Sequence, residues 1–395
     1  MPSALFARLD ALPPLTAEER LLLDSVRALA EGEIAPRAAA YDRSGHFPWD
    51  NIRAINGLGL NAMFVPETYG GAGLSYAAYL ACVREISKAC ASTGIIWATN
   101  FHATKPLIDF GTDEQKERLL PRVAKGAIGA LAITEPDAGS DATGMTTRFT
   151  PEGNDTIIVS GGKTFISNGD VADLYLVFGK WAGIADARQA ISALIIEKGT
   201  PGLAVLRTED KLGHRAASTA ALAFEDCRVP RGNLLGTPGD GLRLLLAALN
   251  KSRPSVAAHA LGIARAAFED AVGYINERRQ SGRRIIEFQG IQFLLADLAT
   301  ELAMCEAWLW HVAGLVDSGI ADIAIEASML KMRASDLAMR MATEAVQLYG
   351  GYGYIKEYRV ERLLRDAKIT QIWEGTNQIH RQLIGRSFIA RPRPR

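Results

Sequence analysis

The segment QIWEGTNQ, at positions 371–378, sets one carboxylate among residues that can orient a ligand. Glu374 stands directly before Gly375, and a hydroxyl and two amides follow. A carboxylate can act as a general base, and a glycine lets the backbone approach a bound molecule closely. An isolated glutamate in a polar turn is usually a solvated surface residue, so this segment predicts catalysis only together with other motifs.

Two further motifs precede this segment. In QLYGGYGY, at positions 347–354, three glycines interrupt a helix-like run and would let backbone amides approach a ligand or phosphate. The tetrapeptide RDAK follows at positions 365–368. A single glycine-rich turn is most often the end of a helix, but three motifs in this order within a short stretch indicate a functional site.

These motifs resemble the C-terminal region of the acyl-CoA dehydrogenase family of flavoproteins, which carries YGGxGY, RDAK and a catalytic E-G-T segment in this order. Two earlier segments are similar to other motifs of that family. ITEPDAGSDATG, at 133–144, resembles its flavin and substrate signature, and GGKTFISNG, at 161–169, resembles its flavin-contacting strand. The resemblance covers nearly the whole chain.

The resemblance implies removal of an α-proton and a β-hydride from an acyl-CoA thioester. Glu374 would be the base, and FAD would accept the hydride because no protein side chain can. A carboxylate is a weak base toward carbon, so the family acidifies the substrate with hydrogen bonds to the thioester oxygen, each worth roughly a hundredfold to a thousandfold. One branch of the family places its base just before the arginine matched by Arg253. Ser252 stands there and cannot deprotonate carbon, so the base is assigned to Glu374.

The resemblance also implies binding residues. Those assigned to the substrate are Ser140, Asn250, Arg253 and Gly375. Those assigned to FAD are Leu131, Ile133, Thr134, Ser140, Phe165, Ser167, Arg278, Gln289, Gln347, Gly350, Gly351, Thr376 and Gln378. Two positions depart from the family pattern, because Asn250 replaces a frequent aspartate and Ser281 replaces an aromatic residue expected near the adenine. The second departure predicts weaker FAD binding.

The segment IIWATNFHATKPL, at 95–107, aligns with the helix that closes the family's acyl pocket. Trp97, His102 and Lys105 are therefore candidates to shape that pocket. Trp97 would favour a short acyl chain and the polar pair a functionalised one. An equally good interpretation places these side chains in the helical core or in solvent.

Composition excludes several function classes. The chain has 395 residues with 44 acidic and 44 basic side chains, so charge gives no reason to expect nucleic acid or an anionic membrane as a partner. No apolar run reaches the roughly 20 residues that cross a bilayer, and the N-terminus resembles neither a signal nor a transit peptide, so we expect a cytoplasmic protein. The cysteines lack metal-ligand spacing and are expected to be buried thiols, and neither they nor the histidines predict a metal site.

The order of patterns predicts helices, then strands, then helices. Helical spacing dominates the first third, short β-rich runs follow Leu131, and long amphipathic stretches cover 242–279, 288–318 and 321–348. This agrees with the fold that the resemblance implies, which is mainly α with a central β-barrel. We expect an N-terminal helical domain at 1–129, a middle β-barrel domain at 130–238 and a C-terminal four-helix bundle domain at 239–395. The resemblance further implies a homotetramer that passes electrons to an electron-transferring flavoprotein.

Two other functions fit the same residues. One is an oxidase that lets oxygen reach the reduced flavin, as acyl-CoA oxidases and nitroalkane oxidases do. Glu374 argues against the nitroalkane type, which uses an aspartate base, and peroxide production would identify an oxidase. The other is a non-catalytic subunit that binds acyl-CoA or flavin, against which the intact Glu374 also argues.

Overall fold

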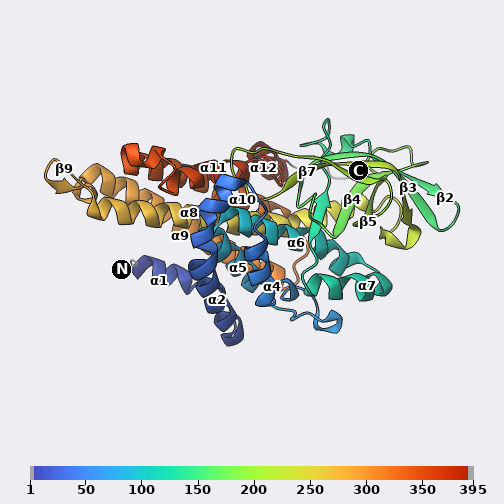
Figure 1. Ribbon diagram of the computed structural model, residues 1–395, viewed down its shortest axis with the longest axis horizontal. Helices are drawn as coiled ribbons and strands as arrows, with labels where there is room; N and C mark the ends of the chain where they lie inside the picture. Colours follow the sequence, from blue (N-terminus) through green and yellow to red (C-terminus); the bar gives the residue numbers. More distant parts are fainter. Residues whose placement is uncertain (1–3, 390–395) are drawn as a thin grey trace.

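The computed structural model describes residues 4–389 and contains a sheet at one end of a long helical body (Figure 1). The chain enters through helices, crosses into the sheet and returns to helices, as predicted. The N-terminal helices are α1 (Ala4–Asp10), α2 (Ala17–Leu29), α3 (Ala35–Ser44), α4 (Trp49–Gly57), α5 (Tyr76–Ala89), α6 (Ala91–Phe110) and α7 (Asp113–Ala124), with a π-helical turn at Ala30–Ile34. Short 3₁₀ turns lie at Leu60–Ala62, Glu67–Tyr69, Ala142–Gly144, Arg231–Asn233, Ile285–Glu287 and Gly350–Tyr354.

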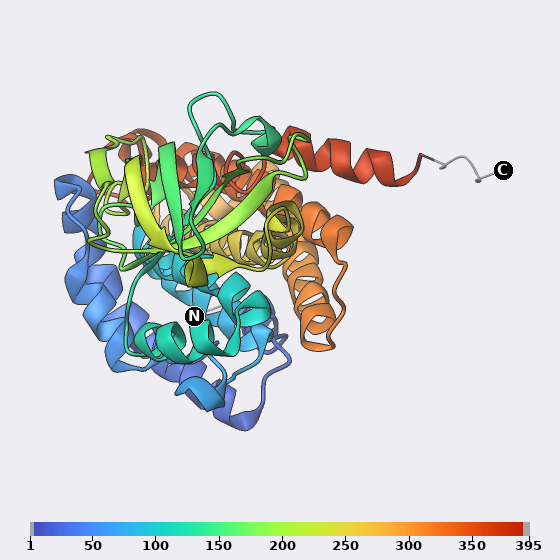
Figure 2. The same cartoon turned by 90° about the vertical axis from the view of Figure 1, so that its right-hand side faces the viewer.

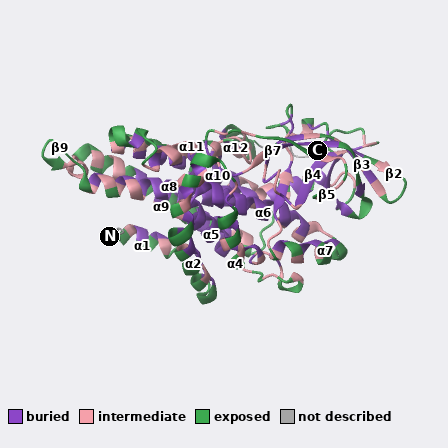
Figure 3. Ribbon diagram, viewed as in Figure 1, coloured by how far each residue is buried: buried purple, intermediate pink, exposed green. Residues whose placement is uncertain are grey.

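The side chains of Thr16 and Glu19 cap the start of α2. The Thr16 side chain accepts from the backbone N–H of Glu19, whose carboxylate accepts from the backbone N–H of Thr16. This reciprocal cap satisfies two of the free donors at a helix start. Almost every residue of α5 and α6 is buried, and these helices form the centre of the molecule together with α8 and α10 (Figure 3).

The middle of the chain forms one mixed sheet. Its strands are β1 (Gly129–Ala132), β2 (Arg148–Glu152), β3 (Thr156–Ser167), β4 (Leu174–Trp181), β5 (Ile191–Glu197), β6 (Leu203–Thr208), β7 (Thr219–Pro230) and β8 (Leu234–Leu235). The order is β6-β7-β3-β2-β4-β5-β8, and β1 lies parallel to β4. The β-rich runs that the sequence shows at 156–160, 174–178, 193–196 and 221–224 lie within β3, β4, β5 and β7.

The prediction of a closed β-barrel is wrong. The edge strands β6 and β8 do not pair with each other, so the sheet stays open. Closing a barrel requires edge strands long enough to form a ladder, and β8 has only two residues, both paired to β5. Helices instead pack against the sheet, since α6 lies against β1 and β4 and α8 against β5 (Figure 2).

The C-terminal part contains the three predicted long helices and two short ones. These are α8 (Gly241–Glu277), α9 (Gln289–Asp317), α10 (Ala324–Tyr349), α11 (Val360–Thr370) and α12 (Asn377–Ser387). The two-residue strands β9 (Arg279–Gln280) and β10 (Arg283–Arg284) form a hairpin at the tip of α8, at the opposite end of the molecule from the sheet (Figure 1). Figure 2 shows α12 extending away from the body.

A buried ion-pair cluster joins α5, α8 and α9. The Glu306 carboxylate, which is fully buried, lies 2.6 Å from Arg84 and 3.4 Å from Arg265. Arg84 also contacts Glu85 at 2.8 Å. Because the charges have lost water, each depends on its partner for stability.

Each of the four cysteines is buried, as predicted. Among residues 4–389, no helix combines the length and the hydropathy that a membrane crossing requires.

Candidate active site

Glu374 lies in the short connection between α11 and α12. It has a positive backbone φ of 53°, and the next residue, Gly375, has a φ of 95°. A β-carbon at Gly375 would lie 3.2 Å from Nε2 of the buried His380, so both the backbone and the space favour glycine there. Thr376 then caps α12 by accepting from the backbone N–H of Ile379. The connection therefore turns sharply at the carboxylate.

Side chains from two other helices surround the Glu374 carboxylate. Ser252 on α8 donates to its Oε2 at 2.6 Å, and Nδ1 of His102 on α6 lies 3.8 Å from its Oε1. Arg253 holds the backbone, because its Nε donates to the Glu374 carbonyl at 3.4 Å. The carboxylate side chain keeps 16% of its surface exposed, so a ligand can reach it.

The structure separates the three candidates for the acyl pocket. His102 is buried beside Glu374, burial lowers its pKa, and its Nε2 has no partner within residues 4–389. Trp97 is buried and packs on the ring of Tyr79 at 5.3 Å. Lys105 pairs with Asp109. Of the three, His102 is the one that lies next to Glu374.

Lys331, which sequence reasoning missed, holds the segment after Glu374. It is buried on α10, and its ammonium group donates to the Gly375 carbonyl at 2.7 Å and to the Asn377 side chain at 3.1 Å. The signal was present, because Lys331 shares helical spacing with buried Ala327 and Ala334. A lysine within an apolar stripe needs a buried acceptor.

Lys331 predicts a pH dependence of stability. Burial lowers its pKa from 10.5 to about 7. Between these values the unfolded chain carries a proton that the folded protein lacks, so the free energy of unfolding rises with pH, by up to about 1.4 kcal/mol per pH unit. Lys331→Met should reduce this slope between pH 7 and pH 10, measured by denaturant unfolding at each pH. Exposed Lys356→Met is the control, and an unchanged slope in Lys331→Met would contradict the assignment.

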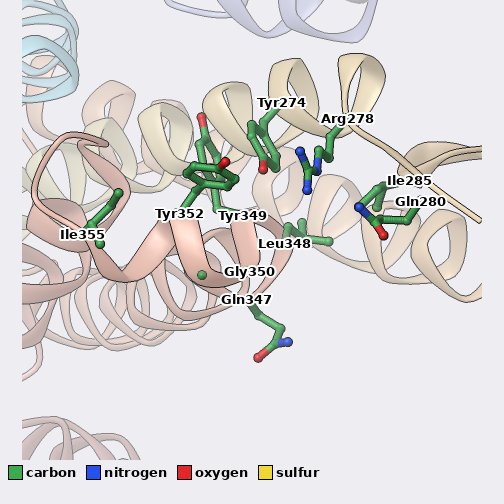
Figure 4. A pocket seen from close by; sticks show the side chains of 11 residues that line it. Tyr274, Arg278, Gln280, Ile285, Gln347, Leu348, Tyr349, Gly350, Tyr352 and Ile355 are labelled. Atoms are coloured by element: carbon green, nitrogen blue, oxygen red, sulfur yellow. The ribbon is translucent and has the colours of Figure 1, made fainter.

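A second group of predicted residues lies at the far end of α8. Arg278, Gln347, Gly350 and Gly351 line one pocket of about 470 Å³. Three tyrosines also line it, and the Arg278 guanidinium lies 5.6 Å from the Tyr352 ring (Figure 4). Gln289, at the start of α9, does not line this pocket. The structure thus brings four of the five residues predicted for this end together.

The predicted residues of the sheet lie close to one another. Leu131 is on β1, and Thr134 follows it and accepts from the backbone N–H of Thr164 at 2.9 Å, beside Phe165. Phe165 is 63% exposed and has a positive φ of 57°. The aromatic ring of Phe165 therefore faces outward next to Thr134.

The remaining predicted residues are placed as follows. The backbone carbonyl of Ile133 accepts from the ammonium group of buried Lys163 at 2.8 Å. Ser167 ends β3, and Asn250 is half-buried on α8 one turn before Arg253. Ser140 and Gln378 are exposed.

The two ends of α8 are too far apart to belong to one compact site. Arg253 lies at the Glu374 end and Arg278 at the hairpin end, about 37 Å away at the rise of an α-helix. Thr376 and Gln378 follow Glu374, whose carbonyl Arg253 contacts, so the predicted FAD residues beside Glu374 and those of the hairpin pocket form two separate groups within one chain.

Comparison with known proteins identifies the chain. Models of the acyl-CoA dehydrogenase N-terminal, middle and C-terminal domains match residues 16–127, 130–227 and 239–389. An acyl-CoA dehydrogenase from Bacillus subtilis is 44% identical, over 95% of this chain and 99% of its own length. The chain belongs to the acyl-CoA dehydrogenase family.

Solved structures of relatives agree with this. Butyryl-CoA dehydrogenase from Megasphaera elsdenii matches with a TM-score of 0.92 at 37% identity, over 95% of this chain and 99% of that one. A chain from the structure of the electron transferring flavoprotein of Acidaminococcus fermentans has the same TM-score and coverage at 40% identity. Acyl-CoA dehydrogenases are oxidoreductases that act on CH–CH groups and depend on FAD.

The residues of this family member fit FAD. The pocket at the hairpin end offers a guanidinium and the glycine backbone at Gly350, whose φ is 60°, and such groups suit phosphate oxygens. The exposed Phe165 ring offers a flat apolar face on the sheet. Within residues 4–389, no cluster of side chains has the composition of a metal site.

Proposed function

We propose that this acyl-CoA dehydrogenase removes the α-proton of an acyl-CoA thioester with Glu374 while the β-hydrogen leaves as hydride. The observation that carries the proposal is the partly exposed Glu374 carboxylate, held by Ser252 at a sharp turn. A base must be both accessible and fixed in position. Glu374 meets both conditions.

The backbone of the same residue supports the proposal. Within residues 4–389, the N–H of Glu374 has no hydrogen-bond acceptor. It is free to donate to the thioester oxygen, which would stabilise the negative charge that forms as the α-proton leaves. Gly375 leaves room beside it. FAD, when bound, supplies the hydride acceptor that protein side chains lack.

We assign FAD binding to a first group, Leu131, Ile133, Thr134, Ser140, Phe165, Ser167, Thr376 and Gln378, and to a second group near the hairpin, Arg278, Gln289, Gln347, Gly350 and Gly351. Ser140, Asn250, Arg253 and Gly375 would contact the substrate. Since the two FAD groups lie at opposite ends of α8, one FAD would contact the first group of one subunit and the second group of a neighbour. This favours the homotetramer that family resemblance implies. We also propose that each chain has three domains, at 1–129, 130–238 and 239–395.

We also propose that electrons pass to an electron-transferring flavoprotein in the cytoplasm. The resemblance to the family and the 40% identical chain in the Acidaminococcus fermentans structure support this acceptor. An oxidase would instead release peroxide when air is present.

The deciding experiment follows the visible spectrum of the purified protein without oxygen. Butyryl-, isobutyryl-, 3-phenylpropanoyl- and glutaryl-CoA are added one at a time. We expect one thioester to bleach the oxidised flavin band, and peroxide assays in air would then separate dehydrogenase from oxidase. A bound flavin that none of the four reduces would overturn the proposal.

The pocket at the hairpin end gives a separate prediction. Arg278→Ala removes the one guanidinium of the pocket lining, so we expect FAD retention after dialysis to fall by about tenfold or more, as for loss of a charged hydrogen bond. Gln280→Ala changes a neutral residue of the same lining and should have a smaller effect. Full flavin occupancy in Arg278→Ala would remove this pocket from the FAD site.

A further inference from the structure

Four buried polar side chains form a chain beneath the residue that precedes the base. Nδ1 of His259 on α8 lies 2.8 Å from the Ser87 hydroxyl on α5. Its Nε2 lies 2.8 Å from Nε2 of His214, in the loop between β6 and β7. Nδ1 of His214 lies 3.8 Å from Asp366 on α11, whose carboxylate also accepts from the His214 backbone N–H at 2.5 Å. The chain thus links the sheet with three helices.

The protons of this chain can be placed by counting donors. Burial lowers the pKa of His259 to about 3 and that of His214 well below 6.5, so both rings are neutral and each carries one N–H. A proton on Nδ1 of His214 faces the Asp366 carboxylate, which leaves its Nε2 as an acceptor. His259 must then donate from Nε2 and accept from Ser87 at Nδ1. Both side-chain hydrogen bonds then point from Ser87 toward His214, whose Nδ1 proton faces the Asp366 carboxylate at 3.8 Å.

Trp373 packs on both histidine rings. Its ring centre lies 5.2 Å from that of His214 and 5.7 Å from that of His259, with interplanar angles of 59° and 57°. The next residue is Glu374, whose positive φ is a conformation that a side-chain-bearing residue keeps only when its surroundings hold it. The orientation of the histidine rings therefore sets where Trp373, and with it the base, can lie.

We propose that His214 and His259 form a positioning pair that holds Trp373, and through it places the Glu374 carboxylate for proton abstraction. This inference rests on the proposed function of Glu374. The pair joins the loop of the sheet to α8, so it also fixes the sheet relative to the helix that carries Ser252 and Arg253. Neither histidine touches the base, and both act through Trp373.

A purely structural role makes a different prediction. A polar chain that only stabilises the fold would lower the fraction of folded, flavin-bound protein, yet each remaining site would turn over at the normal rate. A positioning role lowers kcat per bound flavin and leaves KM nearly unchanged, because the binding contacts stay in place. The two roles are separated by kcat per flavin.

The test compares His259→Phe and His259→Gln with wild type, using the thioester of the four-member panel that reduces wild-type flavin fastest. Phenylalanine keeps a ring under Trp373 but cannot hydrogen-bond, so we expect kcat per flavin to fall about tenfold to a hundredfold, with KM within about threefold. Glutamine can still donate and accept, so it should restore part of the loss. Exposed His46→Phe is the matched control and should match wild type.

Ser87→Ala is a milder variant that still tests the positioning role if His259→Phe does not fold. It removes the terminal donor of the chain, and we expect a fall in kcat per flavin of about threefold to tenfold. Wild-type kcat per flavin in folded Ser87→Ala or His259→Phe would overturn the inference. If wild-type flavin is reduced by none of the four thioesters, the proposed function fails instead, so the two failures are distinct.

A measurement independent of turnover checks the proton placement. In protein labelled with ¹⁵N-histidine, the nitrogen shifts should show His259 protonated at Nε2 and His214 at Nδ1 at pH 7. The opposite tautomers would overturn the direction of the chain and the inference built on it.

Discussion

Glu374→Gln is expected to lower the rate of flavin reduction by acyl-CoA by about a hundredfold to ten-thousandfold, the usual contribution of a general base. Glutamine has nearly the same shape and can still accept from Ser252, but it cannot take a proton from carbon. The variant should therefore fold and bind FAD and acyl-CoA as wild type does. Anaerobic rapid mixing with the best thioester of the panel measures the rate, and a binding titration measures the affinity.

Glu357→Gln is the matched control for this prediction. Glu357 is exposed in the segment between α10 and α11, and the same change there should leave the rate unaltered. Substantial turnover in Glu374→Gln would show that another group removes the α-proton. His102 would then be examined first, since its Nδ1 lies 3.8 Å from the same carboxylate.

Glu306→Gln is expected to lower the free energy of unfolding by about 3–5 kcal/mol, the cost of removing one partner from a buried ion pair. Glu306 is fully buried between Arg84 and Arg265, whose side chains are also buried. Without the carboxylate, two guanidinium groups remain in the core with less compensating charge. Denaturant unfolding of the flavin-bound protein measures the loss.

Glu301→Gln, on the same helix, removes the same charge from a more exposed ion pair. Comparing it with Glu306→Gln shows whether burial of the pair determines the loss of stability. Glu301 pairs with Arg333 and Arg340, whose side chains are about half exposed, and such pairs contribute about 0–1 kcal/mol. We expect the Glu301 variant to unfold within about 1 kcal/mol of wild type. Equal losses in the two variants would mean that the buried cluster has no special role in stability.

The sequence predicted the positions of the helices and strands correctly, but it did not predict that the sheet stays open. Helical and alternating periodicities are local, so α8, α9, α10 and the strands β3, β4, β5 and β7 appear where the patterns indicate. Closure of the sheet depends on whether the edge strands β6 and β8 meet. That is a property of distant segments, and the expected barrel is an open sheet.

Glu374 could be predicted from the sequence because the residues that form its motif are adjacent in the chain. The order carboxylate, glycine and hydroxyl lies within three positions, and the conformation that it requires is local, with positive φ at both Glu374 and Gly375. The residues around the carboxylate could not be found in this way. Ser252, His102 and Lys331 come from three helices separated by long stretches of chain.

The histidines show most clearly what only the tertiary structure decides. In the sequence, His102, His214, His259 and His380 are scattered and form no motif. In the folded chain all four are buried around the segment that carries the base. The sequence by itself determined the family and the helix and strand positions, and it pointed to Glu374 as the proposed base, since these depend on residues close together in the chain. The contacts that hold the base depend on how α6, α8 and α10 pack, because packing alone brings distant polar groups within hydrogen-bond distance.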